Sequence, residues 1–190
     1  MCEEIEEILK AKTEENVKKY KGLVGKFPDL ASCKVLDYLK EAHYFTAPSA
    51  FKHHGNWVGG NFDHSMKVTE FLLEYTENEH LKWEREEAPY IIGLFHDMCK
   101  SDQRTFALKK GEIVIVPGNS PDRRHSEKSI ELIERNIIRM TVEEKLCIYY
   151  HMGEYGGDAD YQVLMAKMIE KNPNIKYTQM ADTAAAKMGI

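Results

Sequence analysis

Two adjacent residues, His96 and Asp97, stand at the end of an apolar segment and give the strongest chemical signal in the sequence. The preceding run, residues 88–95, carries apolar side chains on every side, which predicts a buried helix. A buried carboxylate costs on the order of several kcal/mol unless something compensates its charge. A bound metal cation would compensate the imidazole and the carboxylate together, so the pair indicates metal chemistry.

Other imidazole and carboxylate side chains fall at inward positions of other predicted helices. His64 shares a helical face with Val68 and Phe71, at spacings of four and seven residues. The remaining three are His125, His151 and Asp182. Taken singly, each has an ordinary explanation as a hydrogen-bonded core residue, a helix cap or a salt-bridge partner. Cys99, near the pair, is likewise explained as a small core side chain.

Taken together, these side chains match a metal centre. Imidazole and carboxylate are the ligands of Mn, Fe, Zn, Ni and Co sites. Two such ions about 3.5–4 Å apart need a shared carboxylate and several nitrogen donors. The set therefore predicts divalent transition metal ions as cofactors, drawn from Fe, Mn, Ni, Co or Zn.

The ordered series resembles the HD-domain superfamily of metal-dependent phosphohydrolases, in its six-ligand form. Residues 59–65, Gly-Gly-Asn-Phe-Asp-His-Ser, resemble the glycine turn that precedes the family's first histidine. Residues 96–100, His-Asp-Met-Cys-Lys, resemble its HD-x-x-K signature. The resemblance covers about residues 50–185, and its members in order are His64, His96, Asp97, His125, His151 and Asp182.

The resemblance implies a role for each position. One metal would be held by His64, His96, Asp97 and Asp182. Asp97 would bridge to a second metal, which His125 and His151 would complete. Asp97 and Lys100 are the implied catalytic residues.

Three cations are candidates for contact with the substrate. Lys100 would meet an anionic substrate oxygen; on the residues alone, it equally suits a solvent-facing lysine favoured by the helix dipole. Of Arg123 and Arg124, which precede His125, one could fork onto a phosphate while the other faces water.

The implied reaction is hydrolysis of a phosphomonoester or phosphodiester, with a nucleotide among the candidate substrates. Bound cations would acidify a water, and the resulting hydroxide would attack phosphorus. The alternatives are a di-iron HD-type oxygenase that cleaves a C–C or C–P bond, and a non-catalytic metal-containing regulator. The implied partner is a small phosphorylated anion.

The rest of the chain predicts an all-α fold, an HD-domain helical bundle with one short β-hairpin over about 105–116. Helical periodicity predicts helices over 3–25, 30–42, 63–79, 84–99, 124–139, 141–151, 160–171 and 176–188. Asp63 is a candidate N-cap, and Thr141 with Glu144 has the pattern of a capping box. We expect a single domain over 1–190, with its motif-bearing core at about 50–185 and with 1–45 packing on that core as N-terminal helices.

Composition limits the class of protein. Apolar residues make up 43% of the sequence, charged residues 30%, and the net charge is −5. Wholesale binding to nucleic acid or to acidic membranes is therefore not expected. The four cysteines lack CxxC spacing, and there is neither a signal peptide nor an apolar span of membrane length. We expect a cytoplasmic protein, and the sequence does not decide its oligomeric state.

Overall fold

The computed structural model describes residues 3–52, 55–109, 112–118 and 124–189. The chain is mostly helical with one short antiparallel hairpin, so the expected fold class is confirmed. The elements are α1 Glu3–Val24, α2 Cys33–Glu41, α3 Gly60–Asn78, α4 Ala88–Phe95, α5 Lys100–Gln103, β1 Arg104–Lys109, β2 Glu112–Pro117, α6 His125–Asn136, α7 Val142–Tyr149, the 3-10 turn η1 Gly153–Tyr155, α8 Ala159–Lys171 and α9 Asn174–Lys187. No helix within the described ranges is both long and apolar enough to cross a bilayer.

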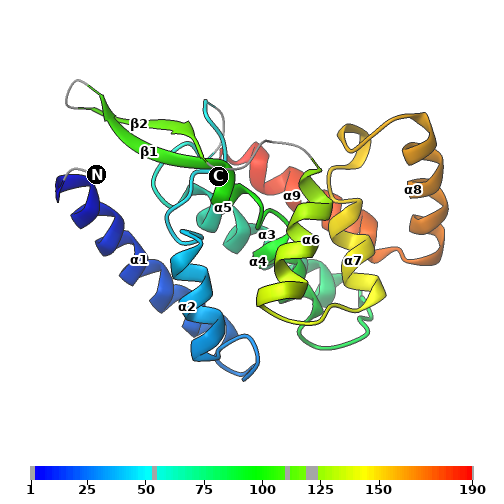
Figure 1. The fold of residues 1–190 in the computed structure, drawn as a ribbon. Helices are drawn as coiled ribbons and strands as arrows, with labels where there is room; N and C mark the ends of the chain where they lie inside the picture. Colours follow the sequence, from blue (N-terminus) through cyan, green and yellow to red (C-terminus); the bar gives the residue numbers. More distant parts are fainter. Residues whose placement is uncertain (1–2, 53–54, 110–111, 119–123, 190) are drawn as a thin grey trace.

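Helices α3, α4 and α9 form the centre of the molecule (Figure 1). α3 packs against both α4 and α9, and α7 contacts α4, α6 and α9. The approach of α3 to α4 is close at Gly93, where an added Cβ would lie 2.4 Å from Thr69 Oγ1. α1, α2 and the hairpin lie to one side of this centre, and α8 lies at the other end (Figure 1).

A cluster of fully buried aromatic rings anchors the end of α4. Tyr44 contacts Phe45, Phe62 and Phe95 with ring centroids 5.4–5.7 Å apart. The Tyr44 hydroxyl also donates a hydrogen bond to the Leu94 carbonyl. Because Phe95 directly precedes His96, this packing fixes the position of the His96–Asp97 pair.

The helix before the pair is shorter than predicted. The sequence predicted one helix over 84–99, whereas α4 spans Ala88–Phe95. Pro89 lies in the first turn, where its missing N–H costs nothing, and so the helix starts there. After Phe95 the chain continues in tight turns, with hydrogen bonds from the Met98 amide to the Phe95 carbonyl and from the Lys100 amide to the Asp97 carbonyl. Lys100 therefore begins a separate helix, α5.

The start of α3 also differs from the prediction. Its N-cap is Gly59, with φ of 84°, and not Asp63. This left-handed conformation suits glycine. Gly60 is equally constrained, because an added Cβ would lie 2.0 Å from the Gly55 carbonyl oxygen. Asp63 sits in the first turn and accepts a hydrogen bond from Trp57 Nε1 at 3.0 Å.

The capping box before α7 is present as predicted. Thr141 Oγ1 accepts from the Glu144 amide, and the Glu144 carboxylate accepts from the Thr141 amide. Arg85 forks onto the same buried carboxylate with two contacts of 2.7 Å. This cap ties the start of α7 to the segment before α4 and so places the end of α7, where His151 follows.

Candidate metal centre

The structure brings all six predicted side chains together from five separate parts of the chain. Neighbouring imidazole rings lie 5.0–5.4 Å apart between centroids. One of the six lies on α3, two follow α4, one begins α6, one follows α7 and one lies on α9. In that order they are His64, His96, Asp97, His125, His151 and Asp182.

Asp97 lies at the middle of this cluster and is almost fully buried. Its Oδ1 contacts His125 Nε2 and lies 3.7 Å from His151 Nε2. Its Oδ2 lies 3.4 Å from His96 Nε2. Two groups able to hold a metal ion overlap at this carboxylate: His64, His96 and Asp97 form one, and Asp97, His125 and His151 form the other.

Two of the histidines are fixed by their own helices. His96 Nδ1 lies 3.0 Å from the Gly93 carbonyl oxygen, and His151 Nδ1 lies 2.6 Å from the Ile148 carbonyl oxygen. A carbonyl only accepts, so each Nδ1 carries the proton and each Nε2 turns toward Asp97. A hydrogen bond on one ring nitrogen is how proteins orient a histidine whose other nitrogen binds metal.

His96 Nε2 provides a test of whether a cation fits. This nitrogen is buried and makes no hydrogen bond to any of the described residues. Its nearest acceptors are Asp97 Oδ2 at 3.4 Å and Asp182 Oδ1 at 3.7 Å, and a buried polar atom without a hydrogen bond needs a reason. Nitrogen and carboxylate donors around it fit a divalent transition metal.

Asp182 adds a second carboxylate to the group of His64, His96 and Asp97. Its Oδ1 lies 2.9 Å from His64 Nε2 and 3.7 Å from His96 Nε2. Its side chain is 22% exposed, against 3% for Asp97. Asp182 thus stands between the buried cluster and the open side of the site.

Lys100 compensates the charge of Asp97. Its Nζ lies 2.5 Å from Asp97 Oδ2 and 3.3 Å from Ser49 Oγ. Burial alone would raise the pKa of Asp97, but Lys100, His96 and His125 outweigh it and hold that pKa well below its usual value.

The buried histidines differ in their electrostatics. Burial by itself lowers the pKa of His96, but Asp97 and Asp182 outweigh it and raise the pKa to about 10. Burial also lowers the pKa of His125, but Asp97 outweighs it and raises the pKa to about 10. For His151 burial prevails, and the pKa is lowered. A cation entering the cluster would have to displace protons from His96 and His125.

Cys99 is part of the site, which the sequence prediction missed. It is fully buried, and its Sγ lies 3.1 Å from His125 Nδ1, on the ring edge opposite to Asp97. His125 thus has a side-chain partner where His96 and His151 have backbone carbonyls. The thiol lies two residues after Asp97 in the sequence, and that proximity was the available signal.

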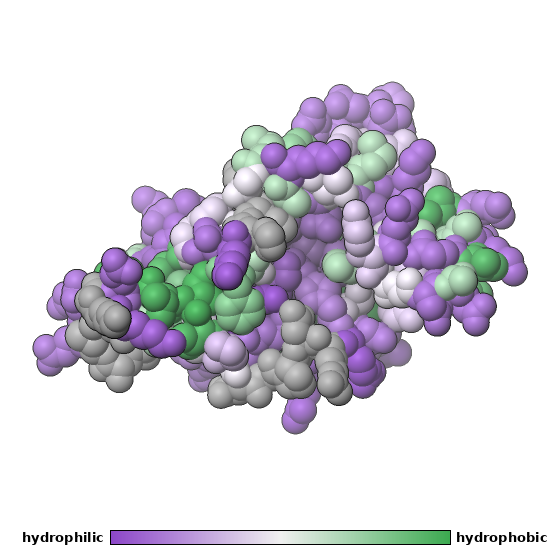
Figure 2. Space-filling view, turned by 90° about the horizontal axis from the view of Figure 1, so that it is seen from above, coloured by the Kyte–Doolittle hydropathy of each residue, from purple (hydrophilic) through white to green (hydrophobic). Residues whose placement is uncertain are grey.

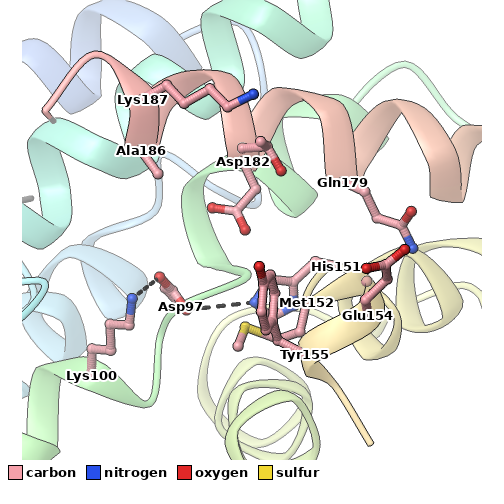
Figure 3. Close-up of a pocket in the computed structure, with 12 residues that line it drawn as sticks. Asp97, Lys100, His151, Met152, Glu154, Tyr155, Gln179, Asp182, Ala186 and Lys187 are labelled. Carbon is pink, nitrogen blue, oxygen red and sulfur yellow. Dashed lines mark ion pairs between the residues drawn. The ribbon is translucent and has the colours of Figure 1, made fainter.

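The cluster opens into a cavity of about 610 Å³ (Figure 3). α5 and the C-terminal end of α9, which contribute to its walls, lie in the upper half of the molecule in Figure 1. The face seen from above is hollowed in its middle and mostly hydrophilic there (Figure 2). The cavity is lined by Asp97, Lys100, His151, Met152, Gly153, Glu154, Tyr155, Gln179, Asp182, Thr183, Ala186 and Lys187.

The two arginines predicted near the substrate lie apart from these walls or outside the described residues. Arg124 directly precedes α6, has a side chain 68% exposed, and pairs with Glu131 at 3.1 Å. Arg123 falls outside the described residues.

Comparison with protein-family models matches one family, described as HD domain, to residues 61–186. This range contains all six clustered side chains and agrees with the resemblance expected from their order. No curated protein and no solved structure matches the chain.

Proposed function

The chain belongs to the HD-domain family, and from this premise we propose that it is a phosphohydrolase that uses two divalent metal ions. Membership indicates the superfamily of metal-dependent phosphohydrolases and a site for divalent metal. The observation that carries the proposal is the position of Asp97, whose two oxygens face two overlapping groups of nitrogen donors.

Each ion has a defined set of donors in this proposal. His64, His96, Asp97 and Asp182 would hold one ion, and Asp97, His125 and His151 the other. When bound, the ions supply Lewis acidity toward the phosphoryl oxygens and acidify a water toward neutrality. The identity of the metal is open among Fe, Mn, Ni, Co and Zn.

Lys100 is the proposed phosphate-binding residue. With Asp97 engaged as a ligand, the ammonium beside it is available to a phosphoryl oxygen at the cavity floor. There it would offset the negative charge that grows on the phosphoryl oxygens during transfer. Arg123 and Arg124 are proposed as secondary phosphate contacts next to His125; Arg124 would have to exchange Glu131 for the phosphate.

The net reaction is hydrolysis of a phosphate ester. The oxygen of water forms a new bond to phosphorus, and the bond from phosphorus to the leaving oxygen breaks. The leaving oxygen departs as an alcohol with one proton from the water, and the other proton stays with the released phosphate. A buried, preorganised set of donors stabilises the transition state at little reorganisation cost.

A substrate screen tests the proposal. Protein purified without chelator is assayed with p-nitrophenyl phosphate, its bis-ester and common nucleotides, with Mn²⁺ or Ni²⁺ added. We expect metal-dependent release of phosphate or nitrophenol that Asp97→Ala abolishes. Turnover that survives in Asp97→Ala would contradict the proposal. Iron content together with substrate-dependent O₂ uptake would favour a di-iron oxygenase instead.

A further inference from the structure

One wall of the cavity is a single face of α9. Gln179, Asp182, Thr183 and Ala186 recur at spacings of three and four, so they line one stripe of the helix. The neighbouring stripe, which carries Thr178, Ala181 and Ala185, is buried in the core. The cavity therefore extends along α9 to both sides of the metal ligand Asp182.

The facing wall is the segment Met152–Tyr155, which follows the ligand His151. Gln162 on α8 holds its backbone, donating to the Gly153 carbonyl at 3.4 Å and to the Glu154 carbonyl at 3.0 Å. Just before the segment, Gln179 on α9 donates to the Tyr150 carbonyl at 2.9 Å. Gly156 also packs closely, since an added Cβ would lie 2.2 Å from the Tyr161 hydroxyl oxygen.

This held segment presents an uncovered aromatic side chain. Tyr155 lines the cavity, and yet it is 89% exposed. No ring among the described residues packs against it. An aromatic face left in water on a fixed backbone gains free energy when a planar group covers it.

The two ends of the cavity differ in charge. Lys100 lies beside Asp97 at the lower left of Figure 3 and Lys187 lies above Asp182, whereas Glu154 and Gln179 lie on the right with Tyr155 between them and Asp97. The side of the cavity at Lys100, next to Asp97, suits the dianionic phosphoryl group.

Hydrogen-bond acceptors dominate the Tyr155 end. Gln179 Nε2 is engaged by the Tyr150 carbonyl and Met165 Sδ, which leaves the amide oxygen to accept. The Glu154 carboxylate has no ion pair with any described residue, so it too can accept. Glu154 would also repel a second anionic group at this end.

The cavity has room for more than a phosphoryl group. A cavity of about 610 Å³ lies in the range that encloses drug-sized ligands, which runs from about 300 to 1,000 Å³. With phosphorus at the metal ligands, the space toward Tyr155 is left for the group bonded to the leaving oxygen.

We propose, on the basis of the phosphohydrolase function above, that Tyr155 selects the leaving group of the substrate. This leaving group is a planar, uncharged ring that stacks on Tyr155. Its N–H or O–H groups donate to the Gln179 amide oxygen and the Glu154 carboxylate. Tyr155 is thus a specificity residue that makes no contact with the reacting phosphorus.

A paired-substrate experiment tests the selection. The metal-loaded full chain is assayed with phenyl phosphate and ethyl phosphate, and kcat/KM for the first is divided by that for the second. Tyr155→Ala should lower this ratio about fivefold or more, the fold-change of the low end, ~1 kcal/mol, of aromatic stacking with a ring. Intrinsic reactivity of the two esters cancels when variant and wild type are compared. Tyr155→Phe should retain the wild-type ratio, as should Tyr177→Ala, which removes a ring that contacts Tyr75 away from this cavity.

A binding experiment separates this proposal from the reaction itself. Phenylphosphonate and ethylphosphonate are titrated calorimetrically into the metal-loaded protein under nitrogen. We expect phenylphosphonate to bind about fivefold more tightly or better, and Tyr155→Ala to abolish the difference. Equal binding of the two phosphonates by wild type, or a difference that persists in Tyr155→Ala, overturns the role of Tyr155. Absence of ester hydrolysis with a Tyr155-dependent phosphonate preference would refute the reaction and support the stacking site.

Discussion

At the scale of single residues, the site depends on one carboxylate, that of Asp97, which several side chains share. Asp97 faces three histidines and Lys100 at once, so each neighbour determines what the carboxylate can bind. Changes at the neighbours should therefore separate metal binding from substrate binding.

Lys100 should affect the substrate more than the metals. Lys100→Ala removes a cation and leaves all six proposed ligands in place. We expect two ions per chain to be retained while kcat/KM for a phosphate ester falls about a hundredfold to a thousandfold, as for loss of one transition-state donor. Metal analysis and steady-state kinetics on the same sample measure both. Lys128→Ala is the matched control, since Lys128 pairs with Asp102; loss of metal in Lys100→Ala would refute the assignment.

Cys99 should orient His125. With a metal on Nε2, Nδ1 carries the proton and donates to the thiol at 3.1 Å. Cys99→Ala removes this acceptor and should weaken binding of the ion at His125 and His151 about tenfold, the lower range for loss of an outer partner. Competition with a chromogenic chelator measures the affinity.

Two variants separate orientation by Cys99 from simple packing. Cys99→Ser keeps an acceptor and should keep most of the affinity. Cys147→Ala removes another fully buried thiol, one that contacts Thr178, and should leave the affinity unchanged. Equal affinities in Cys99→Ala and wild type would show that the thiol only fills space.

At the scale of elements, the glycines determine how closely the helices approach the site. Gly93 lets α4 pack on α3, and its carbonyl also holds His96 Nδ1. The same residue thus serves both packing and ligand orientation.

Gly93→Ala should damage both functions. The added methyl would lie 2.4 Å from Thr69 Oγ1, so α4 must shift or the core must strain. Overpacking of this kind costs about 1–3 kcal/mol, and the shift should also weaken metal binding at His96. Urea unfolding in the presence of chelator measures the loss of stability. Competition with a chelator measures the loss of metal affinity. Gly22→Ala is the control, because no atom lies within 4 Å of its added Cβ, and it should be neutral or stabilising. Wild-type stability in Gly93→Ala would contradict the close packing.

The sequence predicted the elements well where local signals are complete. The hairpin was predicted over 105–116 and spans Arg104–Lys109 and Glu112–Pro117. The Thr141 cap was predicted from its own spacing. The boundaries at Gly59 and Phe95 were missed because a left-handed glycine and a run of tight turns set them. The spacing of apolar residues continues across both boundaries and gives no sign of them.

Other features could not be derived from spacing. Tyr155 and Gln179 become cavity walls only through the packing of α8 and α9, which lies outside any local pattern. Gly156 and Gly157 with Tyr161 were the available hint of a tightly packed turn. The Cys99 contact likewise required the position of α6.

At the scale of the whole molecule, the buried charges of the site tie stability to metal and to pH. Without metal, the Asp97 carboxylate is compensated by Lys100 and by protonated His96 and His125. This compensation is lost when the Asp97 carboxylate gains a proton or when His96 and His125 lose theirs.

The metal-free protein should be most stable in mildly acidic solution. The folded-state pKa values of His96 and His125 are raised from 6.5 to about 10, so their contribution is complete below pH 6.5 and is lost as pH rises through about 10. The pKa of Asp97 lies well below 3.8, so its contribution is present above about pH 4 and is lost in acid. Urea unfolding of chelator-treated protein should give its highest midpoint between these limits; a midpoint that rises steadily toward pH 10 would contradict the assigned pKa directions.

The central claim is that Asp97 joins two metal ions, and metal content tests it most directly. Elemental analysis of wild type and Asp97→Asn, both purified without chelator and dialysed identically, gives ions per chain. We predict about two ions in wild type and a loss of both in Asp97→Asn, because the amide cannot bridge. One ion or fewer in wild type, or two ions retained in Asp97→Asn, would contradict the shared site.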